Sequence, residues 1–182
     1  MRPALAVFAV AAVAQWLLPL SGIWQHERVI SRGTLLKIEC AAPDPYDPLR
    51  GRYLAVRPRE QTAAAPDAFP PGRGAVEVWA TLAAGEDGLA RIESLSVEPV
   101  SGPTVMRLEA RRIGDTDGGP TVGLDWPFDR FYLNERLAPA ADTLVAGKTT
   151  VAELRLLDGR AVLTDILLDG VSVRELAKRQ AE

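Results

Sequence analysis

Acidic, basic and aromatic side chains crowd together between Asp44 and Tyr53, in the run Asp-Pro-Tyr-Asp-Pro-Leu-Arg-Gly-Arg-Tyr. Proline after each aspartate disfavours helix, and the two carboxylates can accept nearby backbone N–H groups in turns. Arg50 is close enough in sequence to pair with Asp44 or Asp47. Gly51 permits a positive φ or a close backbone approach. The favoured interpretation is an elaborate connection between strands.

A second interpretation makes the same run a recognition surface for a peptide or a membrane partner. The candidate motif and interaction residues are Asp44, Asp47, Arg50, Gly51, Arg52 and Tyr53.

Histidine and cysteine each occur once, at His26 and Cys40, and these counts exclude several kinds of site. No internal disulfide can form, and zinc sites built from clustered Cys and His are excluded within one chain. His26 follows closely on a hydrophobic segment, so we interpret it as an interfacial residue and not as a catalytic base. The sequence predicts no catalytic residue, no metal site and no cofactor.

Two further acidic stretches resemble sites only in part. Residues 115–118 (Asp-Thr-Asp-Gly) resemble the start of a calcium loop, but the EF-hand spacing and its distal Glu are missing, which favours a simple turn. Residues 125–132 combine acids with aromatics, as sugar sites do. Paired carboxylates there would serve glycoside hydrolysis only across a cleft, and a packed aromatic patch is the favoured interpretation.

The main enzyme alternative is a membrane-anchored Ser/Lys hydrolase, because signal-peptidase-like proteins also place a β domain after an N-terminal helix. Ser31 would then be the nucleophile, and Lys37 or Lys148 would be its base. The residues around Ser31 do not give the usual context of that nucleophile. We therefore expect a protein that is not an enzyme.

An uncharged apolar segment, residues 3–25, precedes all of these candidates. About 23 residues at 1.5 Å each would span roughly 34 Å, against a hydrocarbon core of about 30 Å. We expect a transmembrane anchor over residues 1–25, with a cleaved secretory signal as the alternative. The positive-inside rule read literally favours a cytoplasmic body, whereas a large trailing domain after a signal-like start favours export. We expect an extracytoplasmic body.

Residues 26–182 predict one domain that is mainly β with minor α, either sandwich-like or barrel-like. Strands are expected at 34–40, 53–57, 75–82, 89–97 and 104–113, the second pairing with the first. A mobile loop is expected near 59–74, and another loop at 114–120. The net charge of −3 gives no basic surface for nucleic acid.

The last third of the chain gives the clearest local signals. Asp158-Gly159 between two alternating segments predicts a hairpin with a type I′ turn, made by strands 150–157 and 160–168. A short helix interrupted near Pro139 is expected within 134–146, and Ser172 is expected to cap a polar helix over 173–179.

The order of these segments resembles the GDYXXLXY protein family, named after its motif. Gly51 and Tyr53 match the first Gly and Tyr of that motif, Val56 replaces its Leu, Arg52 stands where the family has Asp, and Pro58 stands where it has the last Tyr. Residues 130–138 and the 156–170 hairpin are similar as well. The resemblance implies a membrane-tethered bacterial protein of unknown function, often associated with multi-pass membrane proteins, and it carries over no catalytic residue.

The expected function is thus a single-pass accessory or interaction domain of a bacterial inner membrane, whose extracytoplasmic body contacts a membrane protein. A small-ligand-binding domain is the alternative, favoured if a pocket is lined by Trp79, Trp126 or Tyr132.

Overall fold

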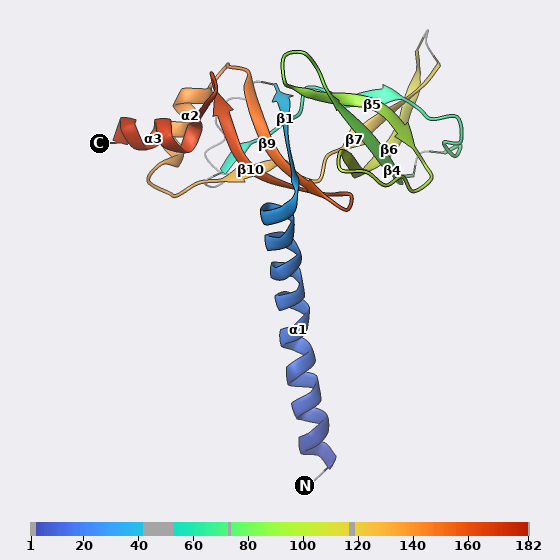
Figure 1. Cartoon of the computed structure of the whole chain (residues 1–182), viewed down its shortest axis with the longest axis vertical. Coiled ribbons are helices and arrows are strands. Elements are labelled where there is room, and N and C mark those ends of the chain that lie inside the picture. The colour runs from blue at the N-terminus through green and yellow to red at the C-terminus, as the bar shows by residue number, and fades with distance from the viewer. Residues whose placement is uncertain (1–2, 42–52, 73, 117–118, 182) are drawn as a thin grey trace.

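A computed structural model describes residues 3–41, 53–72, 74–116 and 119–181 of the chain. The protein has a long helix, α1 (Pro3–Arg32), and a β-rich body from which the helix projects (Figure 1). The motif residues Asp44, Asp47, Arg50, Gly51 and Arg52 lie outside the described residues.

Within the described residues, the strands of the body form three antiparallel sheets. The first sheet has the order β1-β9-β10-β11: β1 (Thr34–Cys40), β9 (Thr150–Leu157), β10 (Arg160–Leu168) and β11 (Val171–Ser172). The second is a ribbon of two strands: β2 (Tyr53–Ala55) and β8 (Arg130–Tyr132). The third has the order β3-β7-β6-β4-β5: β3 (Thr62–Ala64), β7 (Gly119–Asp125), β6 (Val105–Thr116), β4 (Val76–Ala84) and β5 (Ala90–Ser96).

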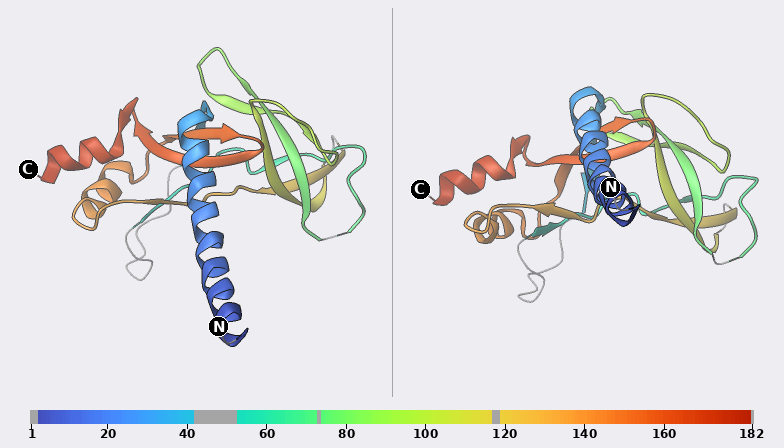
Figure 2. Two further views of the ribbon diagram at one scale, coloured as in Figure 1. Left: turned by 60° about the horizontal axis from the view of Figure 1, so that its bottom comes forward. Right: turned by 90° about the horizontal axis from the view of Figure 1, so that it is seen from below.

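One hydrophobic core joins the three sheets in a barrel-like arrangement. Its fully buried side chains come from both large sheets and include Val78, Leu82, Met106, Leu154 and Leu156. Two short helices, α2 (Ala138–Val145) and α3 (Val173–Ala181), lie together at the end of the first sheet away from the third (Figures 1 and 2). The prediction of a mainly β domain with minor α is confirmed.

Helix α1 continues into β1 through a single residue, Gly33. The N–H of Gly33 donates to the carbonyl of Val29 at 2.8 Å, and its carbonyl accepts from Nη1 of Arg155 at 3.1 Å. A Cβ at this position would lie 2.5 Å from the Val29 carbonyl oxygen and 2.9 Å from the Leu156 backbone nitrogen. The junction therefore needs a residue without a side chain, because backbone atoms occupy that space on two sides.

The helix extends past the predicted boundary at residue 25 and ends at Arg32. Its last turns pack on β9 and β10, and Val29 is buried there. Within the described part of the chain, no helix reaches the length and apolar character needed to cross a membrane. The expected transmembrane span over residues 1–25 thus finds no support in the structure.

Several strands follow the alternation that predicted them. In β4, Val78, Ala80 and Leu82 are buried, as period-two alternation along the strand expected at 75–82 requires. The β9–β10 hairpin turns at Asp158 (φ 51°) and Gly159 (φ 78°), and two successive positive φ angles are those of a type I′ turn. Strand β1 has the predicted bounds, Thr34–Cys40.

The predicted pairing of the strand at 53–57 with the strand at 34–40 was wrong. Strand β2 pairs with β8, with Tyr53 opposite Tyr132. Beyond β2 the chain does return to β1, where Pro58 forms an isolated bridge with Cys40. A short strand pairs with a free strand edge that lies beside it in the fold. The edge beside β2 belongs to β8, which is far away in the sequence.

Two of the expected loops contain strands. The 59–74 segment includes β3, which pairs with β7, and mobility of the rest of that segment stays a prediction. Strands β6 and β7 reach into the loop expected at 114–120, with Thr116 paired to Gly119. Pro139 lies in the first turn of α2 and does not interrupt it, since proline lacks only an N–H that would be unpaired there.

Candidate functional site

Tyr53, the one candidate interaction residue that the structure describes, lies on the β2–β8 ribbon. Its ring is 6.0 Å from the ring of Tyr132, and the guanidinium of Arg130 stands 4.8 Å from the centre of the Tyr53 ring. Tyr132 is 68% exposed. The ribbon therefore presents two tyrosines and an arginine at the surface, and it joins the end of the motif run to the 130–138 segment.

The opposite side of the ribbon anchors it. Leu54 and Phe131 face each other across the two strands and are both buried. The guanidinium of Arg174, in α3, stands 4.8 Å from the centre of the Phe131 ring. Alternation along two three-residue strands thus places the apolar residues on the core and leaves the tyrosines outside.

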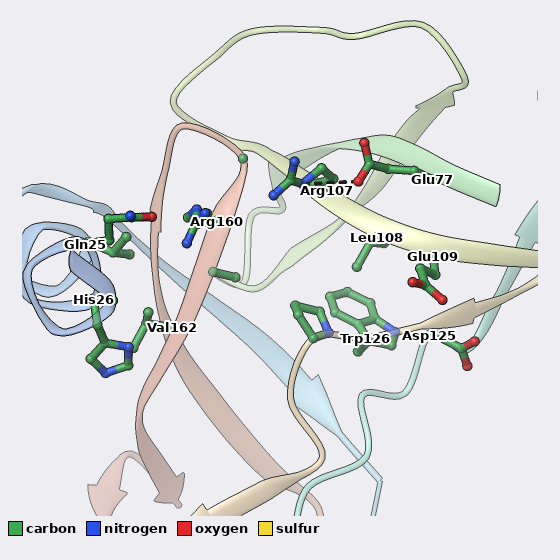
Figure 3. Close-up of a pocket in the computed structure, with 15 residues that line it drawn as sticks. Gln25, His26, Glu77, Arg107, Leu108, Glu109, Asp125, Trp126, Arg160 and Val162 are labelled. Atoms are coloured by element: carbon green, nitrogen blue, oxygen red, sulfur yellow. Dashed lines mark ion pairs between the residues drawn. The ribbon is translucent and has the colours of Figure 1, made fainter. Parts of the chain in front are cut away.

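A larger feature lies between α1 and the third sheet. A cavity of about 620 Å³ is bounded by the last turns of α1, the start of β10, and strands β4, β6 and β7 (Figure 3). Its volume falls in the usual range of small-molecule sites, about 300–1,000 Å³. The β9–β10 turn holds the two sides together, because the carbonyl of Gly159 accepts from the N–H of Arg107 at 2.9 Å.

One wall of this cavity carries a row of three carboxylates. Glu77, Glu109 and Asp125 are direct neighbours across β4, β6 and β7. Arg107 pairs with Glu77 at 3.5 Å, and Arg111 pairs with Asp125 at 3.3 Å. Glu109, in the middle, has no ion-pair partner within the described residues. Like charges directly opposite each other on a sheet repel, so this wall favours a cation.

The facing wall, made by α1 and β10, carries Gln25, His26 and Arg160 (Figure 3). The neighbouring Arg28 is already paired, with Asp158 at 3.5 Å. Arg160 is exposed and, in the described part of the chain, forms no ion pair. This wall therefore favours an anion.

Trp126 supplies the aromatic surface of the cavity. Its indole N–H donates to the carbonyl of Glu60 at 2.8 Å, and its ring lies 5.8 Å from that of Phe128. These contacts fix the ring. Of the three residues expected to line a pocket, Trp126 does so, whereas Trp79 and Tyr132 are absent from the walls of both cavities described here.

Trp126 also borders a smaller cavity of about 290 Å³ between β1 and β5. Its polar residues are engaged with one another or with neighbours: Arg59 pairs with Glu39, and Arg91 pairs with Asp87. The carboxylate of Glu60 accepts from the N–H of Ile92 at 2.8 Å. This space is more consistent with packing between strands than with a ligand site.

The groups considered for catalysis are dispersed. The hydroxyl of Ser31 donates to the carbonyl of Glu27 at 2.8 Å, within its own helix. Lys37 pairs with Glu153 at 3.1 Å. Cys40 is 1% exposed, and burial raises the pKa of its thiol to about 12, so the nucleophilic thiolate does not form near neutral pH.

The described residues provide no metal site either. Among the described residues, no group of three or more His, Cys, Asp and Glu side chains is placed to hold a metal ion. Asp115, proposed above for a turn, pairs with Arg112 at 2.9 Å within the β6–β7 hairpin. The rest of that short run, Asp117 and Gly118, lies outside the described residues.

Sequence reasoning missed the polar residues of the large cavity. The alternation Arg107, Glu109, Arg111 along β6 was a visible signal of a charged sheet face. Arg160 and His26 reach the cavity from segments more than 130 residues apart, and no spacing rule connects them.

Comparisons with known proteins add one assignment. No curated protein and no solved structure matches the chain. The family model for GDYXXLXY protein matches residues 15–166, which include part of α1 and most of the body.

Proposed function

The chain belongs to the GDYXXLXY protein family, and from this premise we propose that it is an accessory domain held at a bacterial inner membrane by α1, where its body contacts a membrane protein. The proposal assigns the protein no catalytic step. It rests mainly on the apolar surface of α1.

The exposed side chains of α1 supply the main support. Ten large apolar residues between Val7 and Trp24 are 54–76% exposed, and the helix stands away from the body (Figures 1 and 2). A helix that is apolar on all sides is normally buried in a core or in lipid. Contiguous apolar surface of this extent marks an interaction site. Burial of α1 in lipid is what the proposal requires, whether or not the helix crosses the bilayer.

The end of α1 next to the body carries residues typical of a membrane–water interface. The guanidinium of Arg28 stands 5.7 Å from the centre of the Trp24 ring, and Glu27 and Arg32 follow. Tryptophan and arginine side chains place their apolar parts in lipid and their polar ends in water. We propose that the membrane surface lies near Trp24 and that the body is extracytoplasmic, which reporter fusions at the C-terminus would test.

Flotation of the full chain with liposomes tests the tether. We expect the wild type to float, and the triple variant Val13→Gln, Leu17→Gln, Leu20→Gln to remain with the soluble fraction. The control is Ile113→Gln, which removes one exposed apolar side chain of the body and should still float. Equal flotation of the triple variant would refute the tether.

The proposed partner is a multi-pass membrane protein, and the β2–β8 ribbon is its proposed contact. Exposed tyrosine and arginine are the residue types that contribute most at interfaces. A photo-crosslinking side chain at position 132 should capture one membrane protein from native membranes. The same group at position 113 should not. Recovery of the uncrosslinked chain alone from both positions would contradict the partner.

Ligand binding is the second candidate function, because Trp126 lines a cavity whose two walls have opposite charge. It is compatible with the tether, and its chemistry can be specified further.

A further inference from the structure

We infer that the cavity beside α1 binds an aminoalkyl phosphate, the zwitterionic chemistry of a phosphoethanolamine headgroup. The lipid source of this ligand rests on the proposed function, whereas the chemistry of the site rests on the cavity alone.

Charge separation between the walls carries the inference. On the sheet wall, two of the three aligned carboxylates are paired with guanidinium groups of the same sheet. Glu109, the third, keeps an uncompensated negative charge. On the helix wall, Arg160 keeps an uncompensated positive charge within the described part of the chain. A ligand with only one charge satisfies one wall and leaves the other unpaired. A zwitterion satisfies both.

The type of each charged group follows from the donors and acceptors. Glu109 can accept N–H hydrogen bonds, which a primary ammonium supplies and a quaternary ammonium lacks. Trp126 offers a ring face that attracts a cation. Across the cavity, the guanidinium of Arg160 can donate two hydrogen bonds to a phosphate, and His26 and Gln25 add nearby donors (Figure 3).

The position of the cavity connects this chemistry to a lipid. Gly22, Gln25, His26 and Val29 line it from one face of α1, since Gln25 and His26 are each three or four residues from both Gly22 and Val29. One turn earlier on that face, Leu18 is 76% exposed. A phospholipid with its headgroup in the cavity would therefore lay its acyl chains along the apolar part of the same helix.

Calorimetric titration of the full chain in non-ionic detergent tests the chemistry with soluble probes. O-phosphoethanolamine should bind at least about tenfold more tightly than inorganic phosphate, ethanolamine or phosphocholine, because each of these lacks one set of charge-assisted hydrogen bonds. Binding of inorganic phosphate as tightly as O-phosphoethanolamine would overturn the inference, and so would the absence of binding by every probe.

Two variants separate the ends of the ligand. Arg160→Gln should weaken phosphate and O-phosphoethanolamine about tenfold and leave ethanolamine unchanged. Glu109→Gln should weaken ethanolamine about tenfold and leave phosphate unchanged. Misfolding cannot produce these opposite patterns. The control Arg112→Gln removes another β6 charge, outside the cavity, and should change nothing. An equal loss in the control would refute the site.

Vesicles distinguish the source of the headgroup. The wild type should bind vesicles of phosphatidylcholine with phosphatidylethanolamine several-fold more tightly than vesicles of phosphatidylcholine alone, and Glu109→Gln should lose that preference. No preference, with soluble binding intact, would assign the site to a free aminoalkyl phosphate. Failure of the tether would abolish vesicle binding and leave the soluble titrations as predicted, so the two proposals fail separately.

Discussion

Replacing Gly33 with alanine should destabilise the body because the junction between α1 and β1 has no space for a methyl group. The new Cβ would lie 2.5 Å from the Val29 carbonyl oxygen and 2.9 Å from the Leu156 backbone nitrogen. Both neighbours are backbone atoms of a packed helix and an internal strand. Neither can rotate away as a side chain would, so the backbone itself must shift.

The cost follows from two contributions. Overpacking of this kind costs about 1–3 kcal/mol. A shift would also weaken the hydrogen bonds of Gly33 with Val29 and Arg155, each contributing about 0.5–1.5 kcal/mol. A total near 3 kcal/mol would lower the melting temperature by about 6–12 °C in a domain of this size.

Thermal unfolding of the full chain in mild detergent, followed by near-ultraviolet circular dichroism, measures the effect. The matched control is Gly22→Ala in the same helix, where an added Cβ meets nothing within 4 Å. Alanine favours helix by about 0.5–1 kcal/mol over glycine, so the control should not lower the melting temperature. A Gly33→Ala protein as stable as the wild type would show that the close approach at this junction is not a constraint.

Three further predictions concern the body. Cys40 should resist thiol alkylation at pH 8 until the protein unfolds, because a pKa raised from 9.0 to about 12 lowers the thiolate fraction about a thousandfold; rapid labelling of the native protein would contradict its burial. Leu154→Ala should cost about 2–5 kcal/mol in chemical denaturation, whereas a cost below about 1 kcal/mol would argue against a packed core at that position. The Arg91 guanidinium, with a smaller contribution from the N–H of Leu89, lowers the pKa of Asp87 to about 2, so the pair should persist above pH 4 and be lost as pH falls through 2; an NMR titration of Arg91→Gln should show the pKa of Asp87 raised toward its ordinary value, and an unchanged midpoint would exclude the pair.

Local signals in the sequence were enough for the hairpins and the alternating strands. The Asp158-Gly159 turn followed from two residues that tolerate positive φ, and the buried face of β4 followed from period-two alternation. These features depend on neighbours in the chain. They could be predicted because the physical cause lies within about ten residues.

Features that depend on pairing between segments far apart in the sequence were not predicted. Strand β3 has three small or polar residues, and it becomes a strand because β7 offers an edge about 60 residues later. Strand β2 was assigned to β1, although β8 is its partner. The contact of Tyr53 with Tyr132 depends on the same pairing, so the motif alone could not predict it.

The cavity was the least predictable feature because no single segment contains it. Its walls combine residues near 25, 77, 108, 126 and 160, brought together when the β9–β10 turn meets β6. The sequence named Trp126 only as one of three residues that would favour ligand binding if they lined a pocket, and a packed aromatic patch was the favoured interpretation of its segment. The opposite charges of the two walls became evident only from the arrangement of the strands.

The direct continuation of α1 into β1 has a mechanical consequence. Figure 1 shows β1 running on from the helix in nearly the same direction. All seven residues of β1 pair with β9, and ladder hydrogen bonds lie perpendicular to the strands. A pull along α1 therefore loads the whole β1–β9 ladder in shear, where the bonds must break together and not one after another. The body is attached to its helix by the geometry that resists tension best.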